Sequence, residues 1–165
     1  MIEKTTEIKT IISMKVSNYI LLFLSVSILL GCSGTGKIPE GDLLYVGHTM
    51  DIEKGKETKK ERKKVKSELN DLIRPIPNKS ILGMRPGIFF YNLAGDVKKE
   101  KGFRHWLKYK IGEEPVLMSK VDLEYNKKVI QNYVENKGYF NAESKADSTK
   151  RGKKAKANYS VKLHN

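Results

Sequence analysis

A strict strand pattern is present in the sequence AKANYSVKL at residues 155–163. Its odd positions are apolar or aromatic, and its even positions are polar. Because successive side chains of a strand point to opposite faces of a sheet, this alternation predicts a strand with one buried face. The expected antiparallel partner is the segment 139–146, joined through a basic turn at 147–154 in which Gly152 permits the chain reversal.

An amphipathic helix is predicted directly before this hairpin. Ser119 and Asp122 have the spacing of a capping box, and apolar residues follow them at helical intervals as far as Val134. Gly138 lies where a left-handed C-cap belongs, so that Tyr139 and Phe140 can fold back against the last helical turn.

A strand and a second helix are expected earlier in the chain. Alternation of the apolar residues Leu44, Val46, Met50 and Ile52 with polar or small ones predicts a half-buried strand over about 43–52. Thr58 and Glu61 form another capping-box pair, followed by helical periodicity. This helix should end near Arg74, because Pro75 disfavours helical geometry in the residue before it.

Residues 78–114 separate the two helical patterns and predict an ordered insertion. This segment holds the apolar run 88–91 and a second group with helical spacing, Phe103, Trp106, Leu107 and Ile111. We expect these side chains to pack into a core, since clusters of aromatic residues are seldom left exposed. The alternative is an aromatic loop that contacts a membrane.

The N-terminal segment has the pattern of an export signal. An uncharged apolar run of 13 residues extends from Tyr19 to Gly31, whereas a membrane-spanning helix needs about 20. Lys15 supplies a basic flank. Residues 1–31 are therefore predicted to be a signal peptide, with Met14 as a candidate for its true start.

The only cysteine, Cys32, follows this run directly. The sequence Leu29-Leu-Gly-Cys32 resembles the lipobox of bacterial lipoproteins, which implies cleavage after Gly31 and attachment of palmitate-type acyl chains to Cys32. The alternative is a buried cysteine at the end of an apolar helix. Residues 32–41 would be the lipidated cysteine and its tether. Ser33, by resemblance to lipoprotein sorting rules, is compatible with delivery to an outer membrane, and the lack of an acidic cluster behind it favours the periplasmic face.

The chain carries 32 Lys and Arg against 19 Asp and Glu, a formal net charge of +13. Removal of residues 1–31 takes away three lysines and two glutamates, so the mature chain keeps +12. Such a balance favours an anionic partner, either phospholipid head groups or nucleic acid, with a solvated surface as the alternative. The basic group at the expected hairpin tip could contact head groups or only solubilise the turn; it comprises Lys150, Arg151, Lys153 and Lys154.

No catalytic or metal-binding pattern is found in the sequence. The three histidines, His48, His105 and His164, follow no ligand spacing. No glycine-rich phosphate loop follows a strand, and a lipidated Cys32 cannot act as a nucleophile. We therefore expect a protein that is not an enzyme and has no cofactor and no metal.

The order of these elements resembles a POTRA domain, the periplasmic module of the BamA/TamA family of outer-membrane assembly factors. Gly138-Tyr-Phe-Asn-Ala142 resembles the turn between the second helix and the second strand of that module. The motifs at 75–78, 83–86 and 102–107 look like the lipoprotein branch of the family. The resemblance covers about residues 38–163. It implies an α+β fold over 42–165, a β-α-α-β-β unit with the insertion at about 78–114 between its helices.

The same resemblance implies a function in outer-membrane protein assembly or translocation. The domain would face the periplasm from an outer-membrane lipid anchor and bind unfolded or extended client proteins, with other subunits of an assembly complex as further partners. Family members carry a membrane β-barrel after the POTRA region, whereas this sequence ends at Asn165. We therefore expect a fragment, a truncated product or a stand-alone module. The alternatives are a structural lipoprotein without clients and a basic nucleic-acid-binding protein.

Client binding is expected at a sheet edge, because an extended segment can add to an edge by main-chain hydrogen bonds whatever its sequence. The candidate edge comprises Tyr139, Phe140, Asn141, Ala142, Glu143, Ser144, Lys145 and Ala146.

Overall fold

The computed structural model describes Tyr19 and residues 34–53 and 55–163. It has the predicted α+β class, with a mixed three-stranded sheet and four α-helices among these residues. The elements are β1 (Leu44–Ile52), α2 (Lys59–Leu72), α3 (Pro86–Ala94), α4 (Phe103–Trp106), a π-helical turn (Leu107–Ile111), a 3-10 turn (Met118–Lys120), α5 (Leu123–Asn136), β2 (Glu143–Arg151) and β3 (Lys154–Lys162).

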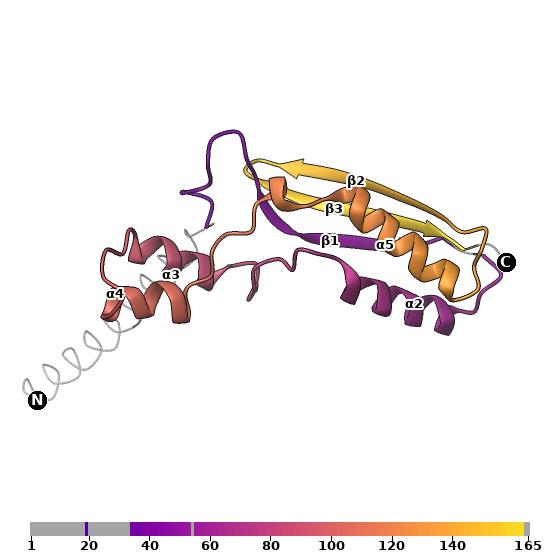
Figure 1. The fold of residues 1–165 in the computed structure, drawn as a ribbon, viewed down its shortest axis with the longest axis horizontal. Coiled ribbons are helices and arrows are strands. Elements are labelled where there is room, and N and C mark those ends of the chain that lie inside the picture. Colours follow the sequence, from indigo (N-terminus) through magenta and orange to yellow (C-terminus); the bar gives the residue numbers. More distant parts are fainter. Residues whose placement is uncertain (1–18, 20–33, 54, 164–165) are drawn as a thin grey trace, which may run out of the picture.

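The sheet order is β1-β3-β2, so the last strand lies in the middle. β3 runs parallel to β1 and antiparallel to β2. Helices α2 and α5 cover one face of this sheet, and α3 and α4 lie beyond one end of it (Figure 1). The fold is therefore a two-layer sandwich with a helical extension.

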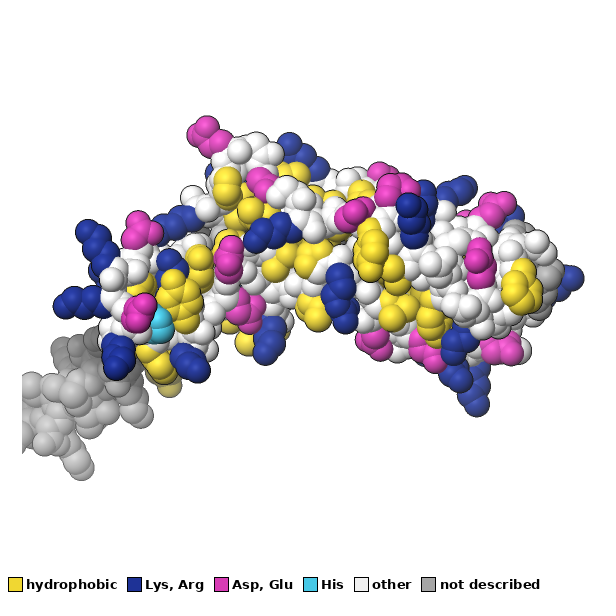
Figure 2. All heavy atoms as spheres, viewed as in Figure 1, with side chains coloured by type: hydrophobic (Ala, Val, Ile, Leu, Met, Phe, Trp, Pro, Cys, Tyr) yellow, Lys and Arg dark blue, Asp and Glu magenta, His cyan; other side chains and the backbone are white. Residues whose placement is uncertain are grey.

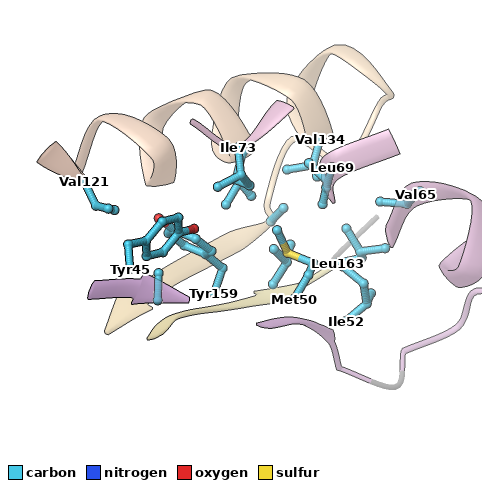
Figure 3. Close-up of a cluster of buried hydrophobic side chains, with 14 residues drawn as sticks. Tyr45, Met50, Ile52, Val65, Leu69, Ile73, Val121, Val134, Tyr159 and Leu163 are labelled. Atoms are coloured by element: carbon cyan, nitrogen blue, oxygen red, sulfur yellow. The ribbon is translucent and has the colours of Figure 1, made fainter. Parts of the chain in front are cut away.

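The alternation at 155–163 is confirmed. Ala155, Ala157, Tyr159, Val161 and Leu163 are all buried, whereas the polar residues between them are at least partly exposed. The last four of these side chains pack with residues of α2 and α5 to form the main core (Figure 3). One face of the sheet is covered by helices and the other is open to water. The central strand therefore carries apolar side chains on the covered face and polar side chains on the open one.

The predicted phase of β1 is wrong in its first half. Leu44 and Val46 belong to a separate small cluster, whereas Tyr45 lies in the main core. The register to β3 shifts between Tyr45 and His48, which marks a β-bulge, and Gly47 in the bulge has φ +123°. An extra residue exchanges the two faces of a strand. After the bulge Met50 and Ile52 point into the main core, as expected.

The N-terminus of α2 is confirmed. The hydroxyl of Thr58 accepts a hydrogen bond from Glu61 N–H at 3.2 Å, and Thr58 N–H donates to the Glu61 carboxylate at 2.8 Å. Val65 and Leu69 of α2 are buried. The helix ends at Leu72, before the prolines that were expected to stop it.

The capping box predicted for α5 is wrong, because the first of its two residues has another role. Asp122 is the N-cap itself and accepts from Tyr125 N–H at 2.8 Å. The hydroxyl of Ser119 instead donates to the carboxylate of Asp42 at 2.5 Å, which joins the start of β1 to the 3-10 turn. Three-residue spacing alone does not distinguish these arrangements.

The C-terminus of α5 is a Schellman motif. Gly138 has φ +96°, Tyr139 N–H donates to the Val134 carbonyl at 3.0 Å, and Gly138 N–H donates to that of Glu135 at 2.9 Å. Tyr139 packs against the main core, as expected, but Phe140 is 77% exposed.

The insertion is closed at its base by Asn78, which is 7% exposed. Its amide donates to the Glu114 carbonyl at 2.8 Å and accepts from Val116 N–H at 2.8 Å. Inside the insertion, Gly112 lies so close to α3 that a Cβ would meet Tyr91 N at 2.9 Å. The loop is therefore an ordered unit made of α3, α4 and the π-helical turn.

The expectation that the second apolar group of the insertion packs into a core is wrong for three of its four residues, since only Leu107 is partly buried. Phe103 is 71% exposed, Trp106 48% and Ile111 40%. Ile88 of the first group is fully buried, where it packs on Ile38 and Leu44. Helical spacing predicted the helix but not which of its faces is covered by another element. The insertion is short, so few elements lie around it to cover a second face.

Candidate polypeptide-binding edge

β2 is an edge strand along its whole length. Its nine residues pair with β3 in an unbroken antiparallel register, and β3 is its only strand partner among the described residues. The other edge of the sheet is partly covered, since Leu44 forms a bridge with Leu117 and Tyr45 N–H donates to the Val116 carbonyl at 2.8 Å. β2 thus offers the longer free edge.

The direction of the free backbone groups follows from the central strand. The carbonyls of Lys153 and Val161 accept hydrogen bonds from Leu44 and Glu53, so the odd residues of β3 direct their backbone groups towards β1. The even residues of β3 therefore bond to β2, where their partners are odd-numbered. The residues of β2 with backbone groups directed to the open edge are Ser144, Ala146, Ser148 and Lys150.

Ser148 illustrates this free edge. Its N–H donates to the carboxylate of its neighbour Asp147 at 2.6 Å. This is a local bond that an incoming strand can replace, because a carbonyl of the new strand would satisfy the same N–H group.

The helix side of the edge is polar. Ser144 donates to the Gln131 side-chain oxygen at 2.9 Å, and the Gln131 amide donates to the Ala142 carbonyl at 2.8 Å and to Glu135 at 2.7 Å. These bonds dock α5 alongside the start of β2. An added strand would meet this face of α5 with every second side chain, which favours polar contacts of low sequence selectivity.

The edge strand begins four residues later and ends five residues later than predicted. Of the eight predicted residues, Glu143, Ser144, Lys145 and Ala146 lie in β2, whereas Tyr139, Phe140, Asn141 and Ala142 form the turn that precedes it. This turn follows the Schellman motif that ends α5. Tyr139 lines a hollow together with Glu61 and Val65 of α2, so its side chain faces that helix and not the edge. Burial raises the pKa of the Tyr139 phenol, and the nearby Glu57 and Glu61 raise it further.

The basic turn predicted at 147–154 is also wrong in extent. Strand pairing continues to Arg151 and Lys154, which leaves only Gly152 and Lys153 as the turn, with Gly152 at φ +59°. The missed residues, Asp147 to Arg151, are polar throughout and show no alternation. Counting back from the regular strand across a two-residue turn would have found them.

Three of the four basic side chains of the hairpin tip lie near Thr35. Arg151, Lys153 and Lys154 line a hollow together with Thr35. Lys150 is exposed one residue before them. Cys32 and Gly31, the predicted lipidation and cleavage positions, lie outside the described residues.

The described histidines are placed separately. His48 bonds to Asn70 Oδ1 at 2.8 Å, and His105 packs on Tyr109 with ring centroids 4.7 Å apart; His164 is outside the described residues. Within the described ranges, no group of three or more His, Cys, Asp or Glu residues could hold a metal ion.

None of the helices in the described part of the chain is both long and apolar enough to cross a membrane. Comparisons with protein-family models, with curated proteins and with solved structures found no match.

Proposed function

We propose that this chain is a non-enzymatic, lipid-anchored periplasmic module of an outer-membrane protein assembly or translocation factor, of the POTRA type found in the BamA/TamA family. It binds extended segments of client proteins along the free edge of β2. The observation that carries the proposal is the row of outward backbone groups at Ser144, Ala146, Ser148 and Lys150.

The arrangement of elements supports this proposal. The chain runs β-α-α-β-β, with α2 and α5 on the same face of a sheet in the order β1-β3-β2 and with an insertion between these helices. The order of the elements is the one on which the resemblance to a POTRA domain rests, and the sheet order places β2, the strand after the second helix, at an edge.

The composition of β2 is suited to transient binding. Its side chains are polar or small, and Lys145, Lys150 and Arg151 are exposed. Lysines on an edge oppose permanent pairing between identical sheets, because like charges of two copies would meet. A client strand of different charge can still bind, through main-chain hydrogen bonds.

The anchor part of the proposal rests on the lipobox-like sequence at 29–32. Acyl chains contribute about 0.8 kcal/mol per buried CH₂ group, so several chains on Cys32 would hold the domain stably at an outer membrane. The domain would then work at the periplasmic face, where client proteins arrive unfolded.

Photo-crosslinking in cells tests client binding. A photoreactive amino acid is introduced at Lys145 or Asp147 of β2, with Lys128 on the exposed side of α5 as the matched control. We expect outer-membrane protein precursors to be captured from the two strand positions and not from the helix. If no precursor is captured from either strand position, the domain has no client at this edge and the structural-lipoprotein alternative is favoured.

A further inference from the structure

The insertion carries an exposed aromatic cluster that the client-binding edge does not use. We call Phe103, Trp106 and Tyr109 the aromatic tip; these side chains are 71%, 48% and 58% exposed. The rings of Phe103 and Trp106 stack with centroids 5.9 Å apart. Three exposed aromatic side chains within seven residues form a candidate contact surface, because grouped exposed apolar side chains mark interaction sites.

The aromatic tip is surrounded by positive charge. Between residues 96 and 110 there are six basic and two acidic residues. One of the basic residues has a structural role, since Lys108 donates to the Gly95 carbonyl at 2.9 Å and lies 4.8 Å from the Tyr91 ring. The other five are exposed: Lys98, Lys99, Lys101, Arg104 and Lys110. Figure 2 shows hydrophobic side chains between Lys and Arg at this end of the molecule.

Residues 34–38 are attached to the unit formed by α3, α4 and the π-helical turn. Gly34 lies against α3, where a Cβ on it would be 3.3 Å from Ile88 Cγ2. Lys37 donates to the Asn92 carbonyl at 2.8 Å, and Ile38 packs with Ile88. Gly34 is only two residues after Cys32 in the sequence. A lipid on Cys32 would therefore hold the insertion close to a bilayer.

We propose that the aromatic tip inserts into the head-group region of a bilayer that carries anionic lipid, with the surrounding lysines and Arg104 on its phosphates. Tryptophan and tyrosine favour this region because their rings are apolar and their N–H and O–H groups are polar. Basic residues add attraction to anionic head groups. The aromatic tip would be a second contact beside the lipid anchor, and this inference rests on the anchor in the proposed function.

Trp106 is the only tryptophan of the chain, so its fluorescence reports on the aromatic tip alone. The full acylated protein is purified in detergent and reconstituted into vesicles of phosphatidylcholine, or of equal parts phosphatidylcholine and phosphatidylglycerol. Flotation measures anchoring. Quenching of Trp106 by brominated lipid, and its protection from iodide, measure insertion of the aromatic tip.

We expect Trp106 emission to shift to the blue and to be quenched by brominated lipid, more strongly in the anionic vesicles. Protein that floats while Trp106 remains open to iodide would overturn the inference and leave the anchor intact. A Trp106 shift that depends on protein concentration in detergent would assign the aromatic tip to a second copy of the chain, which also overturns it. If the purified protein carries no lipid, the anchor proposal fails, and the same quenching with added vesicles still decides the role of the tip.

A set of lysine substitutions distinguishes the effect of the lysines in the insertion from the effect of the net positive charge of the whole protein. Lys99→Gln, Lys101→Gln and Lys110→Gln together should lower the ratio of inserted to free tip by about five-fold for each lysine. The control replaces three exposed lysines of α2, at Lys59, Lys63 and Lys66, by glutamine. Equal losses in both triple variants would show that only net charge matters and would overturn the specific role of the insertion.

Discussion

Asn126, on the buried face of α5, forms two hydrogen bonds with the backbone of Arg74 beyond the end of α2. Its amide donates to the Arg74 carbonyl at 2.6 Å, and its side-chain oxygen accepts from Arg74 N–H at 3.2 Å. The same amide lies 3.0 Å from the hydroxyl of Tyr159 on β3. Asn126 is 1% exposed and thus links both helices to the central strand without access to water.

Asn126→Ala should destabilise the domain by about 2–4 kcal/mol, because it leaves buried backbone groups of Arg74 without partners. Urea unfolding followed by circular dichroism measures the change. The control is Asn132→Ala, an exposed asparagine of the same helix, which should change stability by less than about 0.5 kcal/mol. Similar values for the two variants would contradict the role given to Asn126.

Gly138→Ala should cost about 1 kcal/mol of stability, because φ +96° is unfavourable for a residue with a Cβ. A Cβ at Gly138 would meet no atom within 4 Å, so the cost is conformational and not steric. Gly36→Ala is the control, since that glycine has equal space and no positive φ. Thermal unfolding should give a lower midpoint for Gly138→Ala alone.

Asp42 should make the domain sensitive to acid. The hydrogen bond from the Ser119 hydroxyl, followed by that from Leu43 N–H, lowers the pKa of this carboxyl below its ordinary value of 3.8. Its contribution to stability is complete above that value and is lost as the pH falls through the lowered pKa. The stability difference between the native chain and Asp42→Asn should therefore narrow below about pH 4.

Urea midpoints at neutral pH and at pH values below 4 check this prediction, with Asp51→Asn, at an exposed position of β1, as the control. A difference between native and Asp42→Asn proteins that is constant over this range would show that the charged form of Asp42 is not the stabilising one.

Ser148→Pro should abolish client capture without unfolding the domain. The N–H of Ser148 is directed to the open edge, so its loss removes no bond between β2 and β3, whereas a proline there blocks an incoming strand. Asp147→Pro removes an N–H that bonds to β3 and should lower stability instead. Ser148→Ala, which keeps the N–H, should capture clients normally; loss of capture in this variant would mean that the side chain, not the edge, is recognised.

Cys32→Ser should abolish incorporation of labelled palmitate in cells, because serine lacks the thiol to which the lipid would be attached. Ser33→Ala, one residue later, should leave labelling unchanged. Labelled palmitate in the Cys32→Ser protein would place the acyl group elsewhere and remove the basis for the proposed anchor.

Local signals in the sequence were sufficient for much of the fold. The period-2 pattern at 155–163, the capping pair Thr58 and Glu61, and Gly138 each correspond to a structural feature at the same residues, because each depends on neighbours close in sequence. Together with the periodicities at 44–52 and 121–134, these signals predicted the order of the two helices and three strands, although the bounds of β2 were misplaced.

Contacts between distant residues decided the rest. The bulge at Gly47 exchanges the faces of β1, so that Leu44 packs against Ile88 of the insertion and Met50 packs in the main core. The Ser119 hydroxyl donates a hydrogen bond to Asp42, which is 77 residues away in the sequence. Which partner a side chain contacts depends on the surfaces near it in space. The spacing of residues within one segment does not specify those surfaces.

The free edge of β2 and the exposure of the aromatic tip also depend on contacts between distant parts of the chain. That β2 is an edge follows from the parallel pairing of β3 with β1, and that Trp106 is exposed follows from the absence of a described element packed over α4. The sequence alone determined where strands, helices and the export signal are expected. Only the tertiary structure decided which backbone groups and which aromatic rings remain without a partner, because that depends on how the whole chain is packed.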